Sequence, residues 1–151
     1  MNVQPGRWLG KGSLLAEGQS LGHAVSCDVQ VQKDDDGFTL TGTWQGVEAA
    51  EWEFVLRVVA NEVGTYTLGL RLAGDNLQGT AKLDSPPNLG LLWNDVGTVH
   101  ATFALFPLTQ GYGLRGFVRD GSHVYTWEMS FSLHQETVKA DNVISLPRRP
   151  R

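Results

Sequence analysis

The sequence contains a single cysteine, Cys27, so the chain can form neither an internal disulfide nor a cysteine-rich metal site. No stretch approaches 18 consecutive apolar residues, and the opening MNVQPGRW lacks the basic segment and apolar run of an export signal. We therefore expect a cytoplasmic protein with no membrane span and no membrane partner.

The usual signs of catalysis are also missing. The sequence has no G-x-S-x-G motif, and no Ser/His/Asp set can be chosen by spacing. His23 and Cys27 lie on the same face of one predicted strand, but residues at that separation are about 13 Å apart, too far to share a proton. The sequence indicates no reaction, and it favours a protein that is not an enzyme.

The charge balance argues against a nucleic-acid partner. The net charge is −4, and the three arginines at positions 148, 149 and 151 contribute +3, so residues 1–145 carry −7. An acidic body of this kind repels phosphate backbones.

What the chain does contain is alternation of apolar and polar residues. Its 151 residues suit one domain, and 18 glycines with many Val and Thr residues favour short strands joined by turns. Apolar residues recur at period two in ten segments, which predicts ten strands. These strands are predicted at about 7–16, 21–33, 37–46, 50–61, 64–73, 76–84, 88–94, 97–106, 111–119 and 122–134.

Two segments require a choice of inner face. In 88–94 we take Leu89, Leu91 and Trp93 as one face of the strand. In 111–119 we favour the face of Tyr112 as the buried one, although Arg115, Phe117 and Arg119 compete for it. Residues 136–151 show weak periodicity and a Pro/Arg end, so we predict one barrel domain over 1–135 followed by a polar, basic tail.

The connections predict the architecture. Most are two to five residues long, too short for parallel crossovers, so neighbouring strands must be antiparallel. Closing such a meander removes both sheet edges. We therefore predict an all-β protein with a ten-stranded antiparallel up-and-down barrel, whose interior is wide enough for a ligand unless large side chains fill it.

Gly6-x-Trp8 at the first strand, the serial hairpins and an arginine near the end of the barrel, Arg119, together resemble the calycin superfamily of lipocalin, fatty-acid-binding and nitrobindin-like barrels. The resemblance implies that Arg119 packs over Trp8 in a cation–π contact that closes one barrel end. No helical pair follows the first strand, which moves the resemblance away from the fatty-acid-binding proteins and toward nitrobindin-like or bacterial barrels.

We expect the interior to bind a small apolar molecule, oriented by a few polar groups. The candidate ligand-binding residues are His23, Trp44, Tyr66, Trp93, Tyr112, His123, Tyr125 and Trp127. The alternative is a filled core, with a role in protein interaction such as a homodimer through an exposed strand face.

A haem-binding barrel is a second alternative, because nitrobindin-like barrels use a histidine near the end of the last strand. His134 and His123 are the candidate ligands. Alternation turns His134 outward, however, and His123 lies at the opposite end of its strand. No two histidines have the close spacing of a metal site, and the Asp34-Asp35-Asp36-Gly37 turn lacks further cation ligands, so we expect no metal centre.

Overall fold

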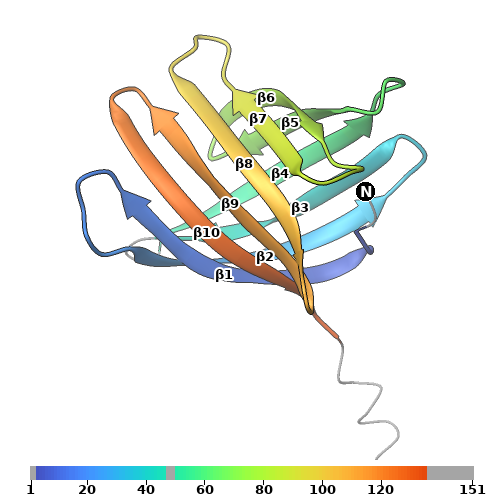
Figure 1. Cartoon of the computed structure of the whole chain (residues 1–151), viewed down its shortest axis with the longest axis horizontal. Coiled ribbons are helices and arrows are strands. Elements are labelled where there is room, and N and C mark those ends of the chain that lie inside the picture. The colour runs from blue at the N-terminus through green and yellow to red at the C-terminus, as the bar shows by residue number, and fades with distance from the viewer. Residues whose placement is uncertain (1–2, 47–49, 136–151) are drawn as a thin grey trace, which may run out of the picture.

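The computed structural model describes residues 3–46 and 50–135, and it confirms the predicted fold (Figure 1). Ten antiparallel strands follow one another and close into a barrel in which β1 pairs with β10. The strands are β1 (Gly6–Ala16), β2 (His23–Lys33), β3 (Gly37–Gln45), β4 (Glu51–Ala60), β5 (Tyr66–Leu72), β6 (Asp75–Lys82), β7 (Asn88–Trp93), β8 (Val99–Leu108), β9 (Gly111–Asp120) and β10 (His123–Leu133).

Tight turns set the register of the hairpins. Asp34 accepts hydrogen bonds from the backbone N–H groups of Asp36 and Gly37, at 2.9 and 3.0 Å, which fixes the β2–β3 turn. The β5–β6 turn places Ala73 and Gly74 at φ angles of 51° and 86°, the left-handed conformation that two-residue hairpins favour.

Glycines on the inner face let neighbouring strands approach closely. A Cβ atom on Gly12, Gly42 or Gly79 would lie within about 2 Å of a carbonyl oxygen of the adjacent strand. No side chain fits at such positions, which are typical of the bends that closure of a sheet requires.

The register corrects the expected orientation of β7. Ala81 pairs with Gly90 and Gly79 with Leu92, so Gly90 and Leu92 face inward. Leu89 and Leu91 are 48% and 47% exposed on the outer wall. The period-two pattern could not decide this strand, because both of its faces are apolar.

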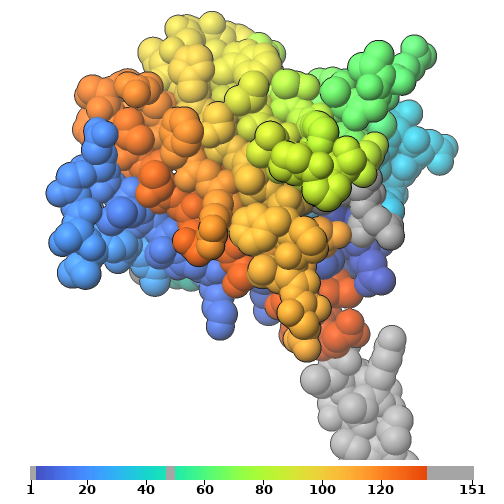
Figure 2. Space-filling view, viewed as in Figure 1, coloured from blue at the N-terminus to red at the C-terminus, as the bar shows by residue number. Residues whose placement is uncertain are grey.

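The predicted inner face of β9 agrees with the register. Leu114 pairs with Leu105 of β8 and Met129 of β10, and Tyr112 with Pro107 and Phe131. Figure 2 shows the outer wall formed by β8, β9 and β10, whose yellow and orange side chains face the viewer. Residues 136–151, predicted as a tail, lie outside the described residues.

Candidate functional site

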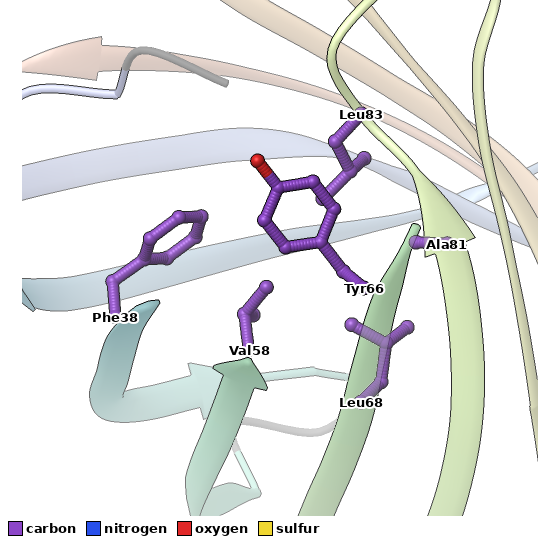
Figure 3. Close-up of a cluster of buried hydrophobic side chains, with 6 residues drawn as sticks. All are labelled: Phe38, Val58, Tyr66, Leu68, Ala81 and Leu83. Atoms are coloured by element: carbon purple, nitrogen blue, oxygen red, sulfur yellow. The ribbon is translucent and has the colours of Figure 1, made fainter. Parts of the chain in front are cut away.

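One end of the barrel is closed by two clusters of buried side chains. The larger contains Phe38, Val58, Tyr66, Leu68, Ala81 and Leu83. Figure 3 shows the Tyr66 ring at its centre, with Phe38 on one side and Leu83 on the other. The smaller contains Trp8, Val29 and Val31.

Two polar groups of this closed end have partners at its edge. The Trp8 indole N–H donates to the Gln4 carbonyl oxygen at 2.9 Å, and the ring lies 5.9 Å from that of Tyr112. The Tyr66 hydroxyl donates to an Asp84 carboxylate oxygen at 2.6 Å. This hydrogen bond, followed by burial, raises the pKa of Tyr66 to about 12.

Arg119 takes no part in closing this end. It pairs with His100 of β8 and Val124 of β10 on the outer wall, at the end of β9 away from Tyr112. The Trp8 side chain lies inside the barrel, near Tyr112. The expected packing of Arg119 over Trp8 is therefore wrong, because the two side chains lie on opposite faces of the sheet and at opposite ends of the barrel.

The other end of the barrel is open and bordered by aromatic rings. Trp44 and Trp52, which pair across the β3–β4 hairpin, stack with ring centroids 4.8 Å apart and planes 8° from parallel. Trp52 is 42% exposed there, whereas Trp8 at the closed end is 8% exposed. We call this open end the mouth; in Figure 1 it faces the upper left.

The inner face of the barrel is apolar, and many of its side chains are only partly buried. The strand register directs many large apolar side chains inward that remain only partly buried, and none of the described side chains is completely buried. The partly buried inward set includes Leu40, Phe54, Leu56, Leu70, Phe103, Leu105, Leu114, Phe131 and Leu133. In a filled core these side chains would be almost fully buried. Part of the inward-facing apolar surface is therefore accessible to water; we call the interior of the barrel the lumen.

Among the described residues, charged side chains are scarce on the inner face of the barrel. In the described strands, the charged residues at inward positions are Lys33, Asp75 and Asp120, all at strand ends. Cys27 faces the lumen between Gly10 and Trp44, and burial raises the pKa of its thiol to about 12. Such an interior suits uncharged molecules.

Two depressions lie on the surface of the described part of the molecule, outside the lumen. The larger, about 740 Å³, is open to solvent and is lined by Lys11, Gly12, Ala24, Val25, Ser26, Gln45, Gly46 and Ser130. The smaller, about 190 Å³, follows the β1–β2 connection. Most of the side chains that line the larger one are exposed on the outer wall.

The chain matches no protein-family model. It matches no curated protein either. The closed ten-stranded barrel is consistent with a calycin-like fold. In the described residues, no helix is long and apolar enough to cross a membrane.

The structure brings most of the predicted ligand-binding residues to the two ends of the lumen. Trp44, Tyr125 and Trp127 lie toward the mouth, where the exposed His23 and His123 also lie.

Tyr66 and Tyr112 belong to the closed end instead. Trp93 faces the outer wall between Gln78 and His100, so its expected place in the lumen is wrong. Trp52 also lies at the mouth, although it was not among the predicted ligand-binding residues. Its signal was available, because Trp44 and Trp52 flank a short connection and so pair across a hairpin.

The histidines considered for haem lie away from the middle of the lumen. The His134 backbone N–H donates to the Arg7 carbonyl oxygen at 2.8 Å, at the end of the outer wall that carries Arg7 and Asp28. Arg7 donates two hydrogen bonds to Asp28, and these, together with a smaller effect of His134, hold the pKa of Asp28 below its usual range. His123 stacks near Tyr125 at the mouth, with ring centroids 6.4 Å apart.

Proposed function

We propose that this protein binds a small apolar molecule in the lumen, without catalysis. The observation that supports the proposal is the partial exposure of the inward-facing apolar side chains along the barrel. Apolar surface left in contact with water is unfavourable by roughly 25 cal/mol per Å², so an occupant that covers it gains that free energy on binding.

The asymmetry of the two ends supports a direction of entry. Trp8, Phe38 and Tyr66 close one end, whereas the other is bordered by the exposed Trp52. A ligand would enter past the Trp44–Trp52 stack and would keep any polar group at the mouth, because charged side chains are missing from the described middle of the lumen.

Neighbouring leucines on β7 provide a matched test. Leu92 faces the lumen and Leu91 faces the outer wall. Leu92→Trp adds an indole to the lumen, and we expect it to weaken binding of N-phenyl-1-naphthylamine, a neutral fluorescent probe, about tenfold or more. Leu91→Trp places the same group outside and should leave the affinity unchanged. Equal effects of the two substitutions, or no binding by the wild-type protein, would overturn the proposal.

Native mass spectrometry of the protein purified from its own host, with an absorption spectrum, tests occupancy directly. We expect a co-purifying apolar molecule of small mass. A Soret band would favour the haem alternative instead, and a protein free of ligand with only the aromatic absorption band would favour an interaction role.

A further inference from the structure

One part of the outer wall carries large apolar side chains where a solvated strand has polar ones. β7 presents Leu89, Leu91 and Trp93 outward, and β9 presents Phe117. Leu89, Leu91 and Phe117 are exposed. Leu91 and Phe117 both pair with Thr102 of β8, so the apolar surface continues over three neighbouring strands. We call this surface the β7–β9 face; its part over β8 and β9 faces the viewer in Figure 2.

The outer wall on the other side of the barrel is polar. The outward pairs of β2 and β3 are Ser26–Gln45, Asp28–Thr43, Gln30–Thr41 and Gln32–Thr39. An antiparallel sheet with one solvated face has this character. The apolar side chains of the β7–β9 face add nothing to the barrel core, and an exposed apolar patch of this kind is typical of an interaction surface.

The border of the β7–β9 face is basic, although the protein as a whole has a net charge of −4. Arg115 and Arg119 flank Phe117 on β9. Lys82 lies on the β6 side, where its amine donates to neutral backbone carbonyl oxygens. Glu128 pairs with Arg115 at 3.1 Å, whereas none of the described carboxylates forms a salt bridge with Arg119. A cationic border around an apolar centre complements an acidic, apolar partner.

We infer that the β7–β9 face binds a partner protein through a segment that carries both apolar and acidic side chains. Aromatic residues and arginine are enriched in protein interfaces, and Trp93, Phe117 and Arg119 supply them here. The described strands close into a barrel without an edge, so the partner contacts side chains and does not add a strand.

Charge also distinguishes this partner from a second copy of the chain. A two-fold dimer through the same face would bring its basic border against an identical one, and like charges in an interface are unfavourable. Binding at the β7–β9 face does not depend on a ligand in the lumen.

Two synthetic helical peptides test the charge preference with the full-length protein. Each has about 18 residues with leucines along one face, flanked by glutamates in one peptide and by lysines in the other. By fluorescence anisotropy of the labelled peptides, we expect the glutamate peptide to bind at least about tenfold more tightly, and raised salt to reduce the difference. Equal affinities, or no binding of the glutamate peptide, would overturn the inference.

A pair of apolar substitutions locates the binding surface. Leu91→Gln removes apolar surface from the centre of the face and should weaken binding of the glutamate peptide about tenfold. Val55→Gln is the matched control, because Val55 is 39% exposed on the outer wall of β4, on the other side of the barrel. It should leave the affinity unchanged. Equal effects of the two substitutions, in variants shown to be folded by circular dichroism, would be incompatible with binding at this face.

A pair of charge reversals separates the border of the face from the net charge of the protein. Arg119→Glu should weaken binding of the glutamate peptide about tenfold and strengthen binding of the lysine peptide. Lys11→Glu on β1 changes the net charge equally but lies outside the face, and it should leave both affinities near those of the wild type. Equal effects of the two reversals would overturn the role of the basic border. Sedimentation analysis adds a final check, because a dimer that Leu91→Gln converts to a monomer would assign the face to a second copy instead.

Discussion

The thiol of Cys27 provides a sensitive measure of how far this inward-facing side chain of β2 is shielded from solvent. Burial raises its pKa from 9.0 to about 12. Because the thiolate is the reactive form, its share at pH 8 falls from about one molecule in ten in the unfolded chain to about one in ten thousand in the native protein. We therefore expect native Cys27 to react with iodoacetamide about a thousandfold more slowly than unfolded Cys27.

The assay is mass-spectrometric labelling at pH 8, with and without denaturant. The double variant Ser26→Cys, Cys27→Ser is the matched control. Position 26 directly precedes Cys27 on the strand and is exposed on the outer wall. Its thiol should react nearly as fast in the native protein as in the unfolded chain.

A native rate for Cys27 within about tenfold of the unfolded rate would refute the reasoning, since it would require a thiolate that the apolar lumen does not favour. The raised pKa also has a thermodynamic consequence. The native state disfavours the thiolate, so the stability associated with Cys27 is fully present below about pH 9 and is lost as the pH rises toward 12.

Three further predictions concern the two ends of the barrel and its turns. Trp8→Ala should lower the free energy of unfolding in urea by about 3–5 kcal/mol. Trp52→Ala, at the mouth, should lower it by only about 1–2 kcal/mol. Equal losses would contradict the assignment of a closed and an open end. Arg57 holds the pKa of Asp34 below its usual value by hydrogen bonding. Arg57→Ala should therefore be less stable than the wild type at neutral pH, and this difference should vanish as the pH falls below about 3.8. A difference that does not depend on pH would contradict the prediction. Tyr66 donates a hydrogen bond to the Asp84 carboxylate, which raises the pKa of Tyr66 to about 12, so native stability should fall between pH 10 and 12. Tyr66→Phe should cost about 1 kcal/mol of stability at neutral pH and should remove that part of the fall. A tyrosine absorbance titration in which all three tyrosines ionise near pH 10 would contradict this prediction.

Local patterns in the sequence were sufficient to predict the strands and the barrel. The alternation of Val25, Cys27, Val29 and Val31 with polar residues identifies β2 and its inner face, and β2 is found at His23–Lys33. Short connections force antiparallel neighbours, and a ten-stranded meander with one apolar face is most simply completed by closure. These features depend on residues close together in the chain, which is why a single sequence predicts them.

Tertiary structure decided which face of an ambiguous strand points inward and which distant residues meet. Both faces of 88–93 are apolar, so only the pairing of β7 with β6 and β8 shows that Trp93 faces outward. The expected contact between Trp8 and Arg119 likewise depended on the direction in which β9 presents its side chains, and the register places Arg119 outside.

The packing of the inward rings also depends on pairs that only the folded structure brings together. The sequence shows many inward rings, and their volume alone is compatible with a filled core. The register places Phe131 beside Gly10 and Phe103 beside Gly90. The first pair joins strands from the two ends of the chain, and the second joins successive strands. The residue type determines how large a ring is, but the residue paired with it on the neighbouring strand determines how much space is left for that ring.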